Sequence, residues 1–171
     1  MKIARAAITV FIAISFVAGA GSVAEAKIAI GKQAPEFKAT TFDGTKVDLE
    51  IYKGDVVIIN IWATWCGPCR TELPVIDGFY RLMSKHGLKV LAVTTEDSVP
   101  NSYLKPLQKA LAFPLAKGFR GPYRAIGGAV PSNYVIDRNG MLRYAKAGAF
   151  DLDALNEILI PLLKEPRPPI Q

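Results

Sequence analysis

The sequence predicts an α/β fold in which helices cover both faces of a central mixed β-sheet. Residues 56–62 (VVIINIW) form an apolar, mostly β-branched run, a helical pattern follows over 68–85, and residues 88–94 form a second apolar run. Strands buried on both faces have this composition, and a strand, a helix and a strand in this order give a parallel pair. A tight turn at 137–140 between two further strands adds an antiparallel pair, so the expected sheet is mixed.

The segment before the first buried strand predicts a β-hairpin. Asp43 and Gly44 are turn residues between two short extended segments, so residues 37–48 are expected to form this hairpin. Residues 49–54 then connect the hairpin to the buried strand.

The first helix is expected to begin at Pro68 and to end before Gly87. Proline fits the first turn of a helix because the N–H that it lacks would have no partner there, and glycine commonly ends a helix. Pro74 lies inside the helical pattern and is expected to kink it.

The next segment predicts a second helix and an irregular connection. The helix is expected over 100–112, with Ser98 or Asn101 as its N-cap. The connection, residues 113–129, is rich in glycine and is expected to lack regular structure.

The last part of the chain predicts a hairpin and a third helix. The hairpin joins strands at 132–136 and 141–147 through Asn139-Gly140, a favoured turn pair. Asp151 is the expected N-cap of the third helix. The apolar residues expected to face the core from this helix are Leu152, Leu155, Ile158 and Leu159.

The first 26 residues predict a secretory signal peptide. Lys2 and Arg5 precede an apolar stretch over 6–20, and Ala24-Glu25-Ala26 has the small-x-small pattern of a cleavage site. An uncleaved membrane anchor is the alternative, because the stretch is close to the shortest length that spans a bilayer. Either interpretation places the rest of the chain outside the cytoplasm, in the periplasm, with membrane contact only if the segment is uncleaved.

Length, composition and charge suit one globular domain. The chain has 171 residues, of which 50% are hydrophobic, and the expected domain spans 27–165 with a proline-rich tail at 166–171. The net charge of +6 is scattered, and the absence of a long basic run argues against a nucleic-acid-binding arm. A mildly basic surface favours acidic partners or simply solubility.

Cys66 and Cys69 are the only cysteines, and three interpretations compete for them. A structural zinc site needs four ligands, whereas the chain has one histidine and no further cysteine. A structural disulfide is also disfavoured, because so small a loop adds little stability. A redox-active dithiol is the favoured interpretation, with no metal and no cofactor other than the Cys66–Cys69 disulfide.

The position of the pair assigns a role to each cysteine. Cys66 lies where the strand meets the helix, and the free N–H groups of a helix N-terminus stabilise a thiolate, the attacking species. Cys66 is therefore expected to be the exposed nucleophile. Cys69, one turn further along the helix, is expected to be the buried resolving thiol.

Three segments together resemble the exported TlpA/ResA branch of the thioredoxin superfamily. They are Asn60–Pro74 (NIWATWCGPCRTELP), the segment from Gly31 to Phe37 with the Asp43-Gly44 turn, and Val130–Asp137 (VPSNYVID). The resemblance covers about residues 31–163. It implies a thioredoxin fold with an N-terminal hairpin and a central insertion, and thiol–disulfide oxidoreductase activity.

The resemblance also implies roles for residues around the cysteines. Pro131 corresponds to a cis-proline beside the disulfide, where the backbone of Val130 pairs with a bound partner; an ordinary trans-proline at a strand start is the alternative. Trp65, Gly67 and Pro68 are expected to contact the partner. Trp65 is also expected to shield the disulfide.

Glu72 is the expected proton-handling carboxylate. Thioredoxin carries a buried aspartate at the position of Asn60, and an amide cannot exchange a proton at neutral pH. Glu72 lies one turn beyond Cys69 and shares a helix face with it, so it is the expected substitute. A solvated glutamate favoured by the helix dipole is the alternative.

The expected function is reduction of protein disulfides in the periplasm. The resemblance implies substrates such as apo-cytochrome c or copper-site cysteines, and a membrane thiol-transfer protein as electron donor. Alternatives are a disulfide-forming oxidant and a dithiol copper-binding or chaperone module. A peroxidase is disfavoured, because Ala63 and Ile59 stand where peroxiredoxins need threonine and proline.

Overall fold

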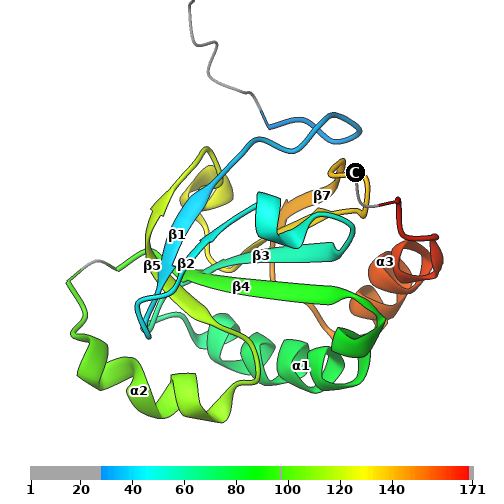
Figure 1. The fold of residues 1–171 in the computed structure, drawn as a ribbon. Helices are drawn as coiled ribbons and strands as arrows, with labels where there is room; N and C mark the ends of the chain where they lie inside the picture. The colour runs from blue at the N-terminus through cyan, green and yellow to red at the C-terminus, as the bar shows by residue number, and fades with distance from the viewer. Residues whose placement is uncertain (1–27, 97, 170–171) are drawn as a thin grey trace, which may run out of the picture.

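The computed structural model describes residues 28–96 and 98–169 as a seven-stranded mixed β-sheet with three α-helices (Figure 1). The predicted signal peptide lies outside the described residues. The strand order is β2-β1-β5-β4-β3-β6-β7. The strands are β1 (Lys38–Thr41), β2 (Lys46–Asp48), β3 (Val56–Trp62), β4 (Leu88–Thr94), β5 (Leu115–Arg120), β6 (Ser132–Ile136) and β7 (Leu142–Ala147). The helices are α1 (Gly67–Met83), α2 (Asn101–Ala110), α3 (Leu152–Lys164) and the 3₁₀ helices η1 (Glu50–Tyr52), η2 (Ser84–His86) and η3 (Ile126–Gly128).

The centre of the sheet is the predicted β3–α1–β4 unit. All seven residues of β3 are buried, and β3 pairs parallel with β4 from Val56–Leu88 to Trp62–Thr94. On its other edge, β3 pairs antiparallel with β6. The predicted parallel pair, the mixed sheet and the α/β class are therefore confirmed, and so is the hairpin of β1 and β2.

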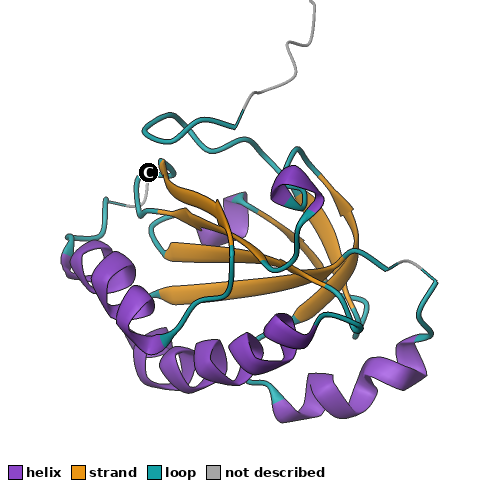
Figure 2. Cartoon of the chain, turned by 180° about the vertical axis from the view of Figure 1, so that it is seen from behind, coloured by secondary structure: helices purple, strands orange, loops and turns teal. Residues whose placement is uncertain are grey.

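The two faces of the sheet are covered by different kinds of segment. One core lies between the sheet and α1, α2 and α3, which all pack on the same face (Figure 2). Loops, η1, η3 and aromatic side chains such as Phe37 and Tyr123 cover the other face. Helical segments thus lie on both faces, but the α-helices lie on one. The crossovers from β3 to β4 and from β4 to β5 run in the same direction, and right-handed crossovers then place both helices on the same side.

The segment expected to be irregular contains a strand. β5 pairs antiparallel with β1 and parallel with β4, so it joins the N-terminal hairpin to the rest of the sheet. The prediction failed because Gly118 interrupts the apolar pattern, whereas the pairing partners on both sides stabilise the strand.

Two details of the helices also differ from the expectation. Pro100, not Ser98 or Asn101, precedes the first residue of α2, and no side chain caps this helix. Leu152, expected in the core, is 56% exposed, whereas Leu155, Leu159 and Leu162 are buried. Leu152 occupies the first position of α3, where Asp151 caps the helix by accepting a hydrogen bond from Ala154 N, as predicted.

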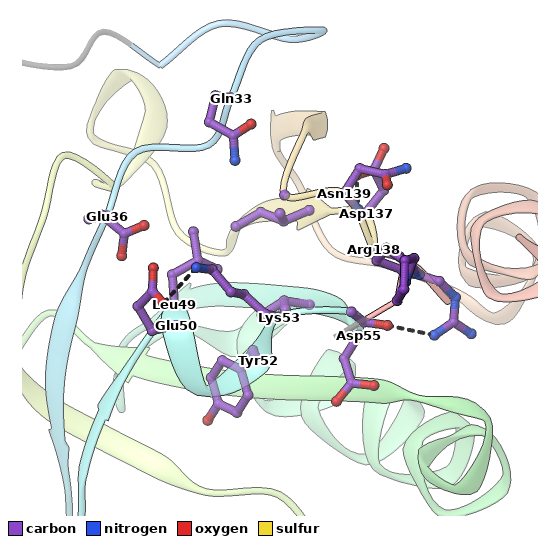
Figure 3. Close-up of a pocket in the computed structure, with 16 residues that line it drawn as sticks. Gln33, Glu36, Leu49, Glu50, Tyr52, Lys53, Asp55, Asp137, Arg138 and Asn139 are labelled. Atoms are coloured by element: carbon purple, nitrogen blue, oxygen red, sulfur yellow. Dashed lines mark hydrogen bonds and ion pairs between the residues drawn. The ribbon is translucent and has the colours of Figure 1, made fainter. Parts of the chain in front are cut away.

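The two ends of β3 have different surroundings. The C-terminal end leads into the cysteines, whereas the N-terminal end borders a pocket of about 600 Å³ lined by Val57, Asp137, Arg138 and residues 49–50 and 52–55 (Figure 3). Pro168 and Pro169 of the proline-rich tail also line this pocket. None of the helices among the described residues is long and apolar enough to cross a membrane.

Candidate active site

The two cysteines lie at the N-terminus of α1 and form a disulfide. Their Cα atoms are 5.3 Å apart, and Cys66 is the N-cap residue of the helix. Cys66 Sγ accepts a hydrogen bond of 3.1 Å from the backbone N–H of Cys69. The helix therefore directs a free N–H group and the positive end of its dipole at Cys66, which favours a negative charge on that sulfur.

The two cysteines are less different in exposure than the sequence suggested. Cys69 is fully buried, as predicted, but Cys66 is only 3% exposed in the disulfide form. The expectation of an exposed Cys66 is therefore wrong for this state. Its neighbours Gly67 and Pro68 are exposed, and the side chain of Trp65 is 71% exposed, so Trp65 stands at the surface beside the site.

Val130 and Pro131 lie directly against the disulfide. The Val130–Pro131 peptide bond is cis, as the resemblance implied. The carbonyl oxygen of Val130 lies 3.5 Å from Cys66 Sγ. Val130 is half-buried, so its backbone borders both the sulfur and the surface. Ser132 fixes this loop, because its hydroxyl donates to Ala129 O and accepts from Ile126 N.

Glu72 is buried beneath the cysteines, one turn along α1 from Cys69. It is only 1% exposed, and its carboxylate accepts three hydrogen bonds. Asn60 Nδ2 donates to Oε2 at 2.8 Å, while Asn133 Nδ2 and the backbone N–H of Phe150 donate to Oε1 at 2.5 and 2.7 Å. The alternative of a solvated first-turn glutamate is therefore excluded by the geometry.

The environment of Glu72 acts on its pKa in two directions. Burial raises the pKa of Glu72 above its ordinary value, and this is the largest effect. The hydrogen bonds from Phe150 N, Asn133 and Asn60 lower the pKa, because they stabilise the carboxylate. The net shift is upward. It brings the pKa of Glu72 closer to neutral pH, where a carboxylate is a more effective proton acceptor.

Two polar residues of the site were not predicted from the sequence. Asn133 is fully buried on β6 and joins Glu72 to Asn60, whose Nδ2 also donates to Asn133 Oδ1 at 2.8 Å. Glu96, which follows β4, accepts hydrogen bonds from the backbone N–H and the hydroxyl of Thr64, and so fixes the loop before Cys66. An amide near the start of the predicted strand 132–136, ahead of its apolar residues, was the available signal for Asn133.

The pocket of Figure 3 is not part of this site. It borders the first residues of β3 and the end of β6, whereas the cysteines follow the last residue of β3. The reactive disulfide instead lies near the surface, between the exposed Gly67-Pro68 turn and Val130. This arrangement suits contact with a macromolecule better than enclosure of a small substrate.

Comparisons with known proteins agree with this geometry. The AhpC/TSA family model matches residues 30–145. The chain is 32% identical over 139 residues to the thiol-disulfide oxidoreductase ResA of Bacillus thuringiensis, with 79% of each chain covered. It is 37% identical over 121 residues to ResA of Bacillus cereus, with 67% of each chain covered.

Solved structures show the same fold. A structure described as a thiol:disulfide interchange protein DsbE from Chlorobium tepidum is 28% identical, with a TM-score of 0.67 over 80% of this chain and 99% of that chain. A thioredoxin family protein from the same organism has a TM-score of 0.65 at 22% identity, over 80% of this chain and 99% of that chain, which supports the fold alone. The chain therefore belongs to the AhpC/TSA family, in its ResA-like branch with a thioredoxin fold, and is a thiol–disulfide oxidoreductase.

Proposed function

We propose that this protein reduces disulfides of other proteins outside the cytoplasm, with Cys66 as nucleophile and Cys69 as resolving thiol. The observation that carries the assignment of roles is the N-cap position of Cys66, whose sulfur accepts the N–H of Cys69. No N–H group of the described residues donates to the sulfur of Cys69, and Cys69 is the more deeply buried of the two.

The reaction proceeds through two exchanges. The Cys66 thiolate attacks one sulfur of a partner disulfide, a bond forms between Cys66 and the partner, and the second partner sulfur leaves as a thiolate. The Cys69 thiol then loses its proton and attacks Cys66 Sγ, which releases the partner as a dithiol. The partner disulfide has gained two electrons, and the Cys66–Cys69 dithiol has been oxidised to the disulfide.

Glu72 is the proposed acceptor of the Cys69 proton. Cys69 lies in the first turn of α1, and Glu72 follows three residues later on the same buried face. Proton transfer from a thiol to a carboxylate is most effective when the two proton affinities are close, and burial moves the pKa of Glu72 in that direction.

The surface around Cys66 supports a protein as the substrate. Trp65, Gly67 and Pro68 are exposed beside the sulfur, and the half-buried Val130 offers a backbone carbonyl there. An extended partner segment pairing with this backbone would place its disulfide at Cys66. We further propose reduction of apo-cytochrome c or of copper-site cysteines as the role, and a membrane thiol-transfer protein as the electron donor.

A resolving-cysteine variant tests this proposal. Cys69→Ser leaves the second exchange without its nucleophile, so the mixed disulfide with Cys66 should accumulate. The measurement is non-reducing electrophoresis and mass spectrometry of complexes isolated from an export-competent host. Cys66→Ser is the matched control and should form no such complex.

The direction of the reaction has its own readout. A reductant should have a reduction potential well below the glutathione range, whereas a value near about −120 mV would identify a disulfide-forming oxidant. Accumulation of the mixed disulfide on Cys69 in the Cys66→Ser variant would contradict the assigned roles.

A further inference from the structure

The hydrogen bonds of Asn133 connect Glu72 to the strand that follows the cis peptide bond. Asn133 Nδ2 donates to Glu72 Oε1 and, at 3.0 Å, to the carbonyl oxygen of Gly148. The backbone N–H of Gly148 donates in turn to the carbonyl oxygen of Pro131 at 2.9 Å. A continuous path of hydrogen bonds therefore leads from the Val130–Pro131 loop to the buried carboxylate.

From this path we propose that Asn133 is a positioning residue for the thiol–disulfide reaction, which holds the Glu72 carboxylate as a proton acceptor and ties it to the partner-contact loop. This inference deepens the proposed function and rests on it, because it assumes that Glu72 takes the Cys69 proton. The side-chain hydrogen bonds of Asn133 reach Asn60, Glu72 and Gly148 but neither cysteine, so Asn133 acts through Glu72.

The orientation of the Asn133 amide is fixed by its neighbours. Its Nδ2 faces two acceptors, Glu72 Oε1 and Gly148 O, while its Oδ1 faces the donor Asn60 Nδ2. A rotated amide would place its oxygen against both of those acceptors. The side chain therefore presents an N–H to the carboxylate in one defined orientation, at a site that is fully buried.

Asn60 depends on the same arrangement. Its Nδ2 donates to both Glu72 Oε2 and Asn133 Oδ1, and its Oδ1 is buried without a hydrogen-bond partner among the described residues. A buried, unpaired acceptor is costly, so the other hydrogen bonds of this amide must offset that cost. The requirement here is an N–H group directed at each of the two carboxylate oxygens.

Among residues 28–96 and 98–169, no cationic side chain forms an ion pair with Glu72. On α1 the nearest charged residue in sequence is Arg70, which is exposed and is not among the groups that shift the pKa of Glu72. On β7 the phenol of Tyr144 has a pKa raised by burial and by the Glu72 charge. Asp151, next to Phe150, directs its carboxylate to Ala154 N instead. Neutral donors thus stabilise the ionised form, so loss of one of them should be visible in the titration.

The test measures the titration of Glu72 directly in the oxidised protein, where the cysteines do not titrate. The probe is the ¹³C signal of the Glu72 carboxyl carbon, followed by NMR across the pH range. Asn133→Leu keeps the branching and the number of side-chain heavy atoms and removes the donor, so the midpoint should rise by about one pH unit. Asn139→Leu is the matched control at an exposed turn position, and its Glu72 midpoint should equal that of the unmodified protein.

A second measurement connects the carboxylate to the reaction. In the reduced protein, the pH profile of thiol alkylation should shift in Asn133→Leu relative to the unmodified protein. When Glu72→Gln is already present, adding Asn133→Leu should cause no such shift. If Asn133→Leu does not fold, Asn133→Asp keeps the shape and replaces the donor with an acceptor, and the Glu72 midpoint should rise further.

The outcomes separate the inference from the proposed function. An unchanged Glu72 midpoint in Asn133→Leu, or a raised midpoint with no shift of the thiol profile, overturns the positioning role. A thiol profile that is the same in Glu72→Gln as in the unmodified protein instead overturns the proposed role of Glu72, whatever the Asn133 variants show.

Discussion

At the scale of the residue, Glu72 links the chemistry of the site to the stability of the fold. Its pKa in the folded protein is raised above the ordinary value of 4.5, mainly by burial. A folded state with a raised pKa binds the proton more tightly than the unfolded chain does. The stabilising effect is therefore fully present below about pH 4.5 and is lost as the pH rises through the folded pKa.

Glu72→Gln should remove this pH dependence from the oxidised protein. The free energy of unfolding of the unmodified protein, relative to the variant, should decrease as the pH rises from about 4.5 through the raised pKa of Glu72 in the folded protein. Urea denaturation at a series of pH values measures this difference. Glu157→Gln, an exposed change on α3, is the control and should show no such trend. A difference that is constant with pH would show that the carboxyl does not titrate in this range.

The sequence predicted Glu72 but not the residues that hold it, for a physical reason. Glu72 and Cys69 are close along one helix, so helical periodicity brings them together. Asn133 meets Glu72 only through the antiparallel pairing of β6 with β3, which sets Asn133 opposite Asn60. This register depends on the whole sheet, and no local pattern contains it.

At the scale of the element, the junction of η2 and β4 depends on Gly87. Gly87 has a left-handed backbone with φ of 89°, the conformation that ends a helix. A Cβ atom there would lie 2.8 Å from both Arg138 Nη1 and Asp55 Oδ1, and 2.5 Å from Arg167 Nη2. The backbone therefore favours glycine, and an added Cβ would also displace the ends of these three side chains.

Gly87→Ala should destabilise the protein by about 2–4 kcal/mol, the sum of backbone strain and crowding. Gly44→Ala is the matched control, because Gly44 has φ of 90° and no atom within 4 Å of the added Cβ. The control should cost only the strain, about 1 kcal/mol. Equilibrium denaturation in urea measures both values. Equal losses in the two variants would show that the side chains around Gly87 move away without cost.

The elements themselves differ in how far local sequence determines them. β3, β4 and α1 carry continuous apolar or helical patterns, and their predicted positions are confirmed. β5 was missed because two of its six residues are Lys117 and Gly118, which suit a loop equally well. Pairing with β1 and β4 decides its conformation, and both partners are distant in sequence.

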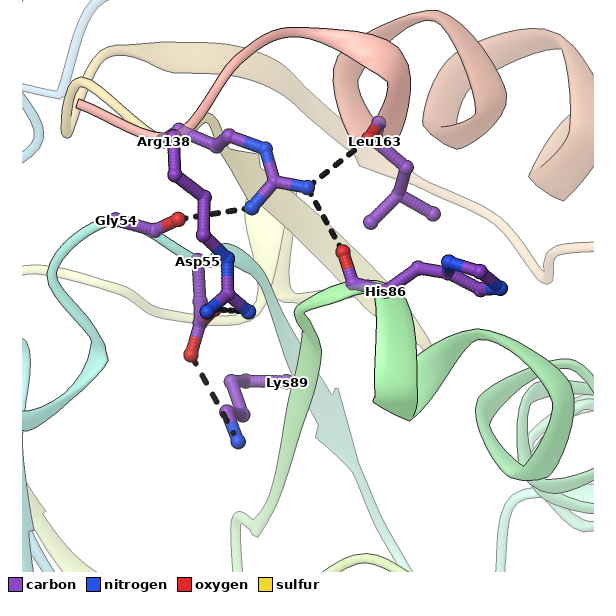
Figure 4. Close-up of polar contacts among 7 residues, drawn as sticks. Gly54, Asp55, His86, Lys89, Arg138 and Leu163 are labelled. Carbon is purple, nitrogen blue, oxygen red and sulfur yellow. Dashed lines mark hydrogen bonds and ion pairs between the residues drawn. The ribbon is translucent and has the colours of Figure 1, made fainter.

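At the scale of the whole molecule, Arg138 joins segments at the end of the sheet opposite the cysteines (Figure 4). Its guanidinium donates to Gly54 O at 2.9 Å, to His86 O at 2.8 Å and to Leu163 O at 2.9 Å. These carbonyls belong to the loop before β3, the end of η2 and the end of α3. The sequence placed Arg138 only in a hairpin turn, because these partners converge on it through the tertiary fold.

Arg138→Met should therefore destabilise the fold by about 2–4 kcal/mol, because three carbonyl groups lose a charged donor at a position that is only 5% exposed. Arg138→Lys should recover part of this loss at most, since a single ammonium lacks the fork that reaches carbonyls in three directions. Urea denaturation measures the free energy of unfolding of both variants, with the exposed Arg120→Met as control.

The reduction potential of the Cys66–Cys69 pair should stay unchanged in folded Arg138 variants, because the cysteines follow the other end of β3. A stable Arg138→Met protein would show that water replaces the guanidinium at these carbonyls, and a shifted potential would show that the two ends of the sheet are coupled.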